Sequence, residues 1–301
     1  MLIAHLSDLH LRDDGDVTWL GRQLDHIAPR NPAHLAITGD LLDRWDPPLL
    51  ARALDCFAHR GLLDATRLTI LHGNHDLASS GGHPRQRADL YRMALRFWDP
   101  PPLVAYRRRL FHSAIERRAP GVIGETPFLK TLDAGARLAV VDTVKVPWRA
   151  ISYTRRTVTV RHAIGCVRRN EMTWLSQQNG STPLIVLAHH YPLEVAPFRW
   201  TPVDGPAGGR WNAPLRRVLR EVCVPMAIGD HDRRLFWDAA QSAGVRLVLC
   251  GHVHRARLEW RGRIAIGLNG QSGASWAGRT VAFYDVSDTD VTCELWNAER
   301  V

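Results

Sequence analysis

The chain has 301 residues, of which 45% are hydrophobic and 23% are charged, and this balance excludes a disordered, collagen-like or coiled-coil protein. Its formal net charge of +9 makes a nucleic acid or another polyanion a partner to consider. Only Lys130 and Lys145 are lysines among the 39 basic residues, and the arginine clusters are short and scattered, so nucleic acid is not favoured.

The sequence also predicts the location and the number of domains of the protein. The first ten residues contain an aspartate and two histidines, unlike a secretory signal. No run reaches the roughly 18 apolar residues of a membrane span, and we expect a cytoplasmic protein. The five cysteines are widely spaced, which indicates neither a disulfide framework nor a zinc ribbon. The length fits one domain over residues 1–301, and the oligomeric state is left open.

Short apolar runs rich in Leu, Ile and Val recur along the chain, and their length is typical of strands buried on both faces. The runs are residues 2–6, 34–38, 68–71, 138–141, 184–188 and 247–250. Helices are predicted between several of them: one from Asp46 to Gly61, one from Asn170, and one from Asp230 to Gly244. Strands that alternate with helices predict a layered α/β fold.

The C-terminal part has a different pattern. Residues 263–268, 280–286 and 291–296 look like consecutive strands separated by turn residues, which predicts an antiparallel ending. We therefore expect a sandwich of sheets with helices outside. The stretches 144–169 and 197–214 have weak periodicity and are expected to form loops or a small cap.

Five of the apolar runs are followed by Asp, His or Asn. The segments are Ser7-Asp8-Leu9-His10, Gly39-Asp40, Gly73-Asn74-His75-Asp76, His189-His190 and Gly251-His252-Val253-His254. The carboxyl ends of strands in an α/β sheet meet at one edge, so these groups can converge there. Aspartate and imidazole together suit Mn, Fe or Zn. The glycines before Asp40, Asn74 and His252 fit a crowded site where the backbone approaches closely.

Each motif alone has an ordinary explanation, such as a turn aspartate, a helix cap or a surface histidine pair. Their occurrence in order, each behind a predicted buried strand, indicates a shared site instead. The similar segment Gly229-Asp230-His231-Asp232 precedes a helical stretch, which favours a capping role. His5 lies within a predicted buried strand and is expected to be a core histidine.

The ordered set resembles the calcineurin-like metallophosphoesterase superfamily, whose pattern is Asp-x-His, Gly-Asp, Gly-Asn-His-Asp/Glu, His and Gly-His-x-His. The opening Ile3-Ala4-His5-Leu6-Ser7-Asp8-Leu9-His10 and the pair His189-His190 are most similar to the bacterial cyclic-nucleotide and glycerophosphodiester phosphodiesterase branch. That branch usually has two prolines after the pair, whereas here Tyr191 precedes Pro192. Either histidine of the pair can be the ligand, and the strand register favours His189.

The resemblance implies a metallophosphoesterase-type β-sandwich flanked by helices, in αββα layers, with antiparallel C-terminal strands. It also implies two divalent or trivalent metal ions, Mn, Fe or Zn. By motif position, Asp8, His10 and His254 would hold one ion, Asn74, His189 and His252 the other, and Asp40 would bridge them. His75 would act on the leaving group as general acid or electrostatic stabiliser, and Asp76 would orient it or raise its pKa. Asp142 would be a structural carboxylate.

The expected function is hydrolysis of an anionic phosphoester, in particular a phosphodiester, by in-line attack of a hydroxide bound to both metal ions. Two alternatives are a DNA or RNA nuclease on the same fold and a catalytically inert scaffold, although a scaffold would normally lack some ligands. Selectivity is expected to lie in the stretches 144–169 and 197–214. Arginines there could grip a second phosphate or an acidic headgroup, and tryptophans of loop-like segments could line a substrate pocket: Arg155, Arg156, Arg199, Arg210, Trp148, Trp200, Trp211 and Trp276.

Overall fold

The structure is a computed structural model of the chain. It describes residues 1–78, 101–133, 135–145, 151–153, 157–160, 164–196, 198–200, 221–224, 227–270, 272–273, 279–287 and 289–297. Six of the residues singled out as candidates for substrate contact lie outside this part of the chain: Trp148, Arg155, Arg156, Arg210, Trp211 and Trp276.

The first of the two large sheets has the strand order β15-β14-β1-β2-β3. Its strands are β1 (Leu2–Leu6), β2 (His34–Thr38), β3 (Leu68–Leu71), β14 (Thr280–Val286) and β15 (Val291–Asn297). Strands β1, β2 and β3 are parallel, while β14 is antiparallel to both β1 and β15. The predicted bounds of β1, β2, β3 and β14 agree with the observed ones.

The second large sheet has the order β12-β13-β11-β8-β5-β4. Its strands are β4 (Phe128–Thr131), β5 (Arg137–Val140), β8 (Leu184–Leu187), β11 (Val245–Cys250), β12 (Ala256–Arg261) and β13 (Ile264–Asn269). The four inner strands are parallel and the two outer ones are antiparallel to their neighbours. The predicted antiparallel ending is confirmed, and the chain crosses from the second sheet to the first between β13 and β14.

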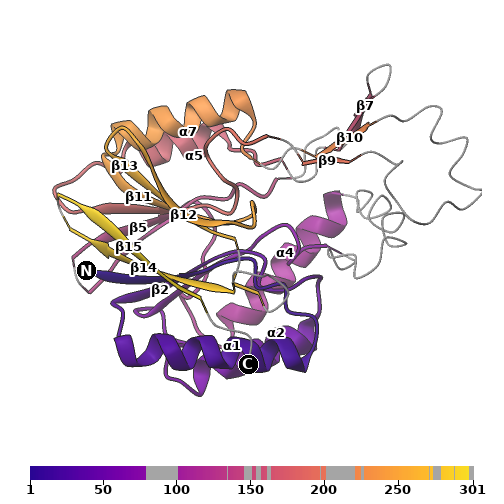
Figure 1. Cartoon of the computed structure of the whole chain (residues 1–301), viewed down its shortest axis with the longest axis vertical. Helices are drawn as coiled ribbons and strands as arrows, with labels where there is room; N and C mark the ends of the chain where they lie inside the picture. Colours follow the sequence, from indigo (N-terminus) through magenta and orange to yellow (C-terminus); the bar gives the residue numbers. More distant parts are fainter. Residues whose placement is uncertain are drawn as a thin grey trace, which may run out of the picture.

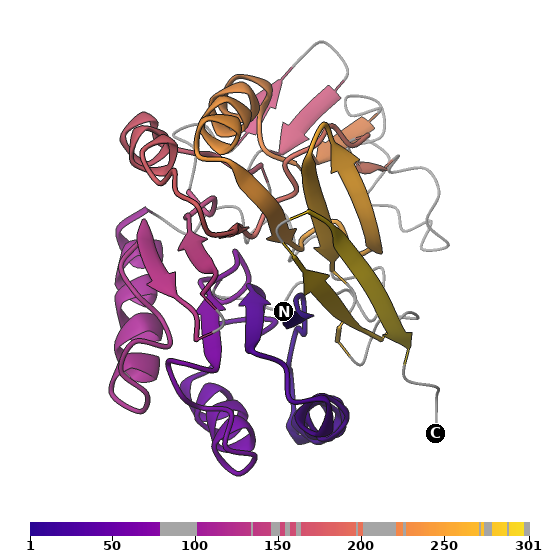
Figure 2. The same cartoon turned by 90° about the vertical axis from the view of Figure 1, so that its left-hand side faces the viewer.

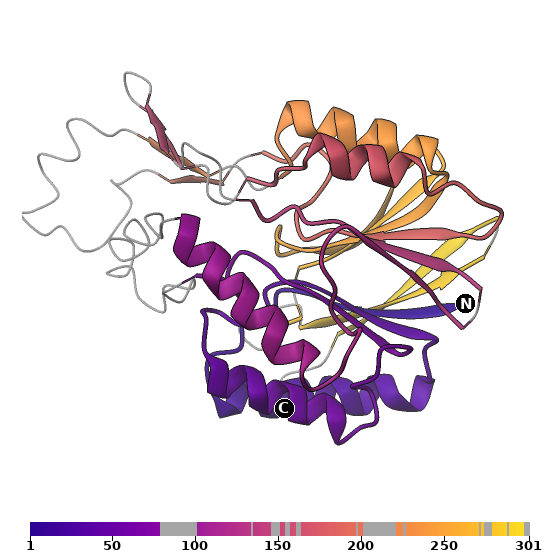
Figure 3. The same ribbon diagram turned by 180° about the vertical axis from the view of Figure 1, so that it is seen from behind.

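Helices cover the outer faces of both sheets (Figures 1 and 2). Helices α1 (Asp14–Ile27), α2 (Pro47–Ala58) and α4 (Pro101–Glu116) pack against the first sheet, with the short 3-10 helix η1 (Ala28–Arg30) after α1. Helices α5 (Arg169–Ser176) and α7 (Asp230–Ser242) pack against the second. Figure 3 shows α4 beside α2 from behind. The predicted sandwich of sheets between helices is confirmed.

The predicted and observed first residues of α2, α5 and α7 agree to within one residue. The Asp46 side chain accepts a hydrogen bond from the Leu49 amide at 3.0 Å and caps α2. Helix α5 begins one residue before Asn170. Asp230 is the first residue of α7, whose N-cap is Gly229.

Burial on both faces explains why the strands are continuous apolar runs. Within β1, Ile3 packs between the two sheets, whereas Ala4 and Leu6 pack on the helix side. The core between the sheets contains Leu138, Val140, Ile185, Leu187, Leu247 and Leu249 from β5, β8 and β11. This arrangement holds the ends of the two parallel strand sets in fixed positions relative to each other.

A third, smaller sheet has the order β6-β7-β10-β9. Its strands are β6 (Ile151–Tyr153), β7 (Thr157–Val160), β9 (Phe198–Trp200) and β10 (Glu221–Val224). Strands therefore occur in both stretches for which loops or a small cap were expected, and β9 contains Arg199 and Trp200. Across the described helices, none has the combined length and apolar character that a membrane crossing requires.

Candidate metal centre

The polar residues that follow β1, β2, β3, β8 and β11 come together at one edge of the sandwich. Three groups of side chains offer ligand atoms that lie within 4.8 Å of one another: Asp8, His10 and His254; His10, Asp40 and His75; and His189, His190 and His252. The first two groups share His10. Residues that are up to 246 positions apart in sequence thus face one small volume.

Asp40 lies between His10 and His189, which follow strands of different sheets. Its Oδ2 is 3.7 Å from His10 Nε2 and 3.5 Å from His189 Nε2. His10 follows β1 of the first sheet and His189 follows β8 of the second. One carboxylate oxygen is therefore directed to both sides, as a bridging ligand would be.

The remaining candidate ligands lie on either side of Asp40. On one side, Asp8 Oδ1 is 3.4 Å from His254 Nε2 and 3.8 Å from His10 Nε2. On the other side, Asn74 Oδ1 is 3.0 Å from His189 Nε2. Each side combines oxygen and imidazole nitrogen donors.

Hydrogen bonds from neighbouring groups orient these ligands. Ser7 Oγ and the His252 amide both donate to Asp8 Oδ2, at 2.6 and 2.9 Å, and so Oδ1 is left facing the histidines. His189 Nδ1 lies 2.8 Å from the Thr38 carbonyl oxygen, to which it donates. The lone pair of His189 is consequently on Nε2, which faces the centre.

The backbone at the site has a left-handed conformation that residues other than glycine rarely adopt. Five of the candidate ligands have positive φ: Asp8 (55°), His10 (46°), Asp40 (51°), His252 (67°) and His254 (49°). Such left-handed positions cost on the order of 1–3 kcal/mol each and concentrate at functional sites. The strand ends are therefore bent to direct these side chains inward.

Two glycines allow the segments of the site to approach each other closely. A Cβ atom on Gly73 would lie 2.1 Å from Asp40 Oδ1, and one on Gly251 would lie 2.0 Å from Ser7 Oγ. No side chain can be accommodated at such distances without movement of the site. The predicted close approach of the backbone at these glycines is confirmed.

Burial and charge set the protonation of the candidate ligands. Burial raises the pKa of Asp40 well above its ordinary value. Burial also acts on Asp8, but hydrogen bonds and charges of His10 and His254 hold the pKa of Asp8 well below its ordinary value. Burial lowers the pKa of His189 to about 4, so its imidazole is neutral at pH 7, which is the form that binds metal.

These residues fit a metal ion. Asp40 Oδ2 is buried and accepts no hydrogen bond from the described part of the chain. Together with its raised pKa, this indicates that neighbouring protein groups compensate a negative charge there only in part. A cation would supply that compensation, and the donor set of carboxylate, amide oxygen and imidazole suits Mn, Fe or Zn.

His75 lies at the edge of the centre, and its contacts correct the role expected for Asp76. The Asp76 carboxylate accepts hydrogen bonds from the amides of Leu42 and Gly73, at 2.8 and 2.7 Å. It therefore stabilises the turn instead of orienting the ring. His75 Nδ1 instead lies 3.1 Å from the carbonyl oxygen of Asp43 and 3.6 Å from its Oδ1.

Asp43 is a site residue that the sequence analysis missed. Its Oδ1 is also 3.5 Å from His10 Nδ1, so one carboxylate contacts two histidines of the site. Burial would raise the pKa of Asp43, but the hydrogen bonds and charges of His10 and His75 hold it far below its ordinary value. The signal that could have revealed it is the second aspartate three residues after Asp40.

His190 is close to the centre but is held differently from His189. Its Nδ1 lies 2.9 Å from Thr143 Oγ1, and its amide donates to the same hydroxyl oxygen at 3.0 Å. Its ring centroid is 4.4 Å from that of His252. His189 is the member of the pair whose Nε2 faces Asp40, and this geometry supports His189 as the ligand.

Two other residues from the sequence analysis have structural contacts. Asp142 accepts from Arg108 Nη1 at 2.9 Å, and its Oδ1 is 3.4 Å from His72 Nε2. His5 is buried, and its Nε2 lies 2.8 Å from Thr38 Oγ1. Burial lowers the pKa of His5 to about 3, as in a neutral core histidine.

Comparison with known proteins supplies independent information. A family model described as calcineurin-like phosphoesterase matches residues 1–256. Among solved structures, a dimetal phosphatase from Danio rerio is 10% identical with a TM-score of 0.57, covering 98% of this chain and 96% of that one. The protein TT1561 of Thermus thermophilus is 12% identical with a TM-score of 0.52, covering 98% of both chains. At these identities the likeness shows the fold alone. The comparison with curated proteins found no match.

Proposed function

The chain belongs to the calcineurin-like phosphoesterase family, and from this premise we propose that it is a phosphodiesterase that uses two metal ions. The observation that carries the proposal is the position of Asp40. Its buried Oδ2 lies 3.7 Å from His10 Nε2 and 3.5 Å from His189 Nε2, which belong to different proposed ligand sets. One oxygen shared by two ligand sets fits a bridged pair of ions.

Six further residues complete the proposed ligand sets. Asp8, His10 and His254 would hold one ion, Asn74, His189 and His252 the other, and Asp40 both. Bound there, Mn, Fe or Zn ions would activate water and stabilise the charge of an in-line displacement at phosphorus. The protein side chains then serve to orient the substrate and to move protons.

His75 is the proposed proton donor to the leaving group. Its Nδ1 is directed to Asp43, which leaves Nε2 to face a substrate at the centre. The side chain is 18% exposed, so the ring is partly accessible from solvent. From Nε2, His75 would give a proton to the departing oxygen, a contribution of about 10²–10⁴-fold in rate.

Asp43 is the proposed positioning residue for this proton transfer. Its carbonyl oxygen accepts from His75 Nδ1 and fixes the orientation of the ring. Its carboxylate oxygen Oδ1 lies 3.6 Å from His75 Nδ1 and also faces His10 Nδ1 at 3.5 Å. One residue thereby links a proposed metal ligand to the proposed acid.

The preference for a diester is supported by the resemblance of the opening motif and of the His189-His190 pair to the cyclic-nucleotide and glycerophosphodiester branch. The test is hydrolysis of bis(p-nitrophenyl) phosphate and p-nitrophenyl phosphate by metal-stripped protein supplied with Mn, Fe or Zn. We expect metal-dependent cleavage with the diester preferred. Asn74→Ala should abolish it, whereas Asn170→Ala, at an exposed position on α5, should retain it.

A separate experimental result would overturn each part of the proposal. Preference for the monoester would overturn the assignment as a phosphodiesterase. Full activity of Asn74→Ala would overturn the ligand set. Elemental analysis that finds one ion per active chain would overturn the dinuclear centre.

A further inference from the structure

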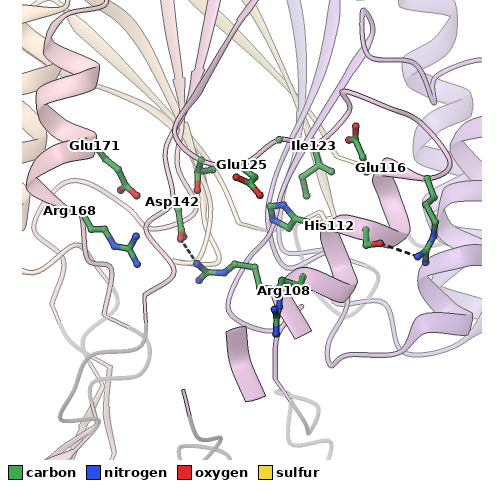
Figure 4. A pocket seen from close by; sticks show the side chains of 13 residues that line it. Arg108, His112, Glu116, Ile123, Glu125, Asp142, Arg168 and Glu171 are labelled. Atoms are coloured by element: carbon green, nitrogen blue, oxygen red, sulfur yellow. Dashed lines mark hydrogen bonds and ion pairs between the residues drawn. The ribbon is translucent and has the colours of Figure 1, made fainter. Parts of the chain in front are cut away.

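A second hollow lies next to the metal centre, between α4, residues 123–126, the end of β5 and the start of α5 (Figure 4). Its volume of about 670 Å³ is in the range of small-molecule sites. Four of its lining residues are arginines: Arg108, Arg109, Arg117 and Arg168.

The pocket and the metal centre share a wall. Asp142 lines the pocket, and its Oδ1 is 3.4 Å from Nε2 of His72, two residues before the proposed ligand Asn74. The next residue, Thr143, holds the His190 ring through a hydrogen bond of 2.9 Å. The pocket and the metal centre are therefore neighbours, separated by the buried side chains of Asp142 and His72.

The carboxylates at the inner end of the pocket already have cationic partners. Asp142 pairs with Arg108 at 2.9 Å, and Glu171 pairs with Lys145. Arg168 is exposed, and it forms no ion pair with any residue that the structure describes. This end of the pocket consequently carries a cation that the described carboxylates do not neutralise.

Figure 4 shows Arg168 and Arg108 extending from opposite walls toward the middle of the pocket. The Arg108 guanidinium is already engaged, because its Nη1 pairs with Asp142 and its Nη2 donates to the Val144 carbonyl. Arg168 is therefore the cation at this end that an added anion would neutralise. The exposed carboxylates Glu116 and Glu125 also line the pocket, and Figure 4 shows Glu116 at the end away from Arg168. Figure 4 shows Glu125 nearer the middle of the pocket, so an added anion is favoured only at the end that contains Arg168.

We propose that this pocket binds a second anionic group, a phosphate or a carboxylate, at Arg168. Guanidinium groups bind both kinds of anion through paired hydrogen bonds. The group belongs either to the substrate, in which case the inference rests on the proposed function, or to a separate small anion. The same chemistry recognises both, and the experiment below distinguishes them.

The kinetic test uses two diesters that differ by one phosphate: thymidine 5′-(p-nitrophenyl phosphate) and its 3′-phosphorylated form. For the metal-loaded wild type we expect kcat/KM to be at least about 10-fold higher with the 3′-phosphate. Arg168→Gln should lower this ratio about 10-fold. Arg169→Gln is the matched control, because Arg169 is the exposed neighbour and does not line the pocket.

A calorimetric test measures sulfate binding to the same three proteins. Sulfate can also bind at the metal centre, so only a difference between Arg168→Gln and Arg169→Gln is assigned to the pocket. If Arg168→Gln binds sulfate more weakly, but the wild type has nearly equal kcat/KM for the two diesters, the pocket binds a separate anion. Nearly equal kcat/KM of the wild type for the two diesters, together with equal sulfate affinities of Arg168→Gln and Arg169→Gln, would overturn the proposal. If neither diester is cleaved, the proposed function fails, and the sulfate measurement alone decides the pocket.

Discussion

Replacement of Asp43 by asparagine tests the link between the metal centre and the proposed acid. The change keeps the shape of the side chain and removes its charge. Oδ1 of Asp43 is buried at 3.5 Å from His10 Nδ1 and 3.6 Å from His75 Nδ1. Hydrogen bonds to charged groups contribute about 1.5–3 kcal/mol, and loss of a partner behind a metal ligand or acid costs about 10- to 100-fold. We therefore expect kcat of Asp43→Asn to fall by about 10- to 100-fold.

This loss should be smaller than that of His75→Ala. The backbone carbonyl of Asp43, 3.1 Å from His75 Nδ1, is unchanged by the substitution and still orients the ring. Removal of the ring itself should cost about 10²–10⁴-fold. The order of the two effects follows from the fact that Asp43 contacts His75 through two separate groups.

The assay compares substrates that differ in their need for an acid. Bis(p-nitrophenyl) phosphate releases a stable anion, whereas glycerophosphocholine must release an alkoxide that requires a proton. If Asp43 acts through His75, kcat should fall at least about 10-fold further with glycerophosphocholine than with the nitrophenyl ester. Metal content, measured in the same preparations, should remain at the wild-type value.

Two results would refute this reasoning. Equal losses with both substrates, accompanied by loss of metal, would mean that Asp43 acts only through His10. An unchanged kcat with glycerophosphocholine would mean that its carboxylate has no part in proton transfer.

Three further substitutions test other parts of the structure. Gly251→Ala would place a Cβ 2.2 Å from Asp8 Oδ2, and we expect metal per chain to fall and stability to drop by about 1–3 kcal/mol, measured by elemental analysis and urea unfolding. Burial lowers the pKa of His34 to about 4, so the unfolded chain binds more protons in acid and stability falls below pH 6.5. His34→Gln should accordingly lose about 2 kcal/mol less than the wild type between pH 7 and pH 5, and an equal loss in both proteins would contradict the assignment. Trp237→Phe removes the 2.8 Å hydrogen bond from the indole to the Pro192 carbonyl and should lower the free energy of unfolding by about 1–3 kcal/mol, while an unchanged urea midpoint would contradict this role.

The parallel strands of the two large sheets could be predicted because most of their residues are buried on both faces, whereas the more exposed strands β4 and β12 were not predicted. Such strands are uninterrupted apolar runs, and polar residues mark their ends, as in β1, β2 and β3. Among the α-helices of the described residues, α1 and α4 were not predicted. Helix α1 contains Gly15 and Gly21, which lower helix propensity, although Leu20, Leu24 and Ile27 have helical spacing and are buried.

Helix α4 was not predicted because it contains a cluster of arginines. Its arginines look like a solvated cluster in the sequence, but Arg107 is buried and donates to the Leu77 carbonyl at 3.0 Å. Its apolar residues Phe111 and Ile115 lie one turn apart and pack into the core below the first sheet. The long aliphatic part of an arginine can occupy a buried position that composition alone assigns to solvent.

The metal centre also contains some residues that could be predicted from the sequence and others that could not. The candidate ligands could be predicted because each directly follows a strand, and parallel strands end at the same edge. The groups that orient them could not, because their contacts depend on how separate segments lie side by side. Asp76 is adjacent to His75 in sequence but is directed to the Gly73 amide, whereas Asp43, 32 residues away from His75, contacts the ring.

The location of the site explains how the strained backbone is maintained. Asp8 belongs to the first sheet, yet its Oδ2 accepts a hydrogen bond from the amide of His252, which follows β11 of the second sheet. Both residues have positive φ, a conformation that persists only where surrounding contacts over-determine it. Those contacts include the apolar core between the sheets, so packing far from the site fixes the separation of the strand ends. The candidate ligands are therefore held in position by the fold itself, which leaves less reorganisation to be carried out when a metal ion binds.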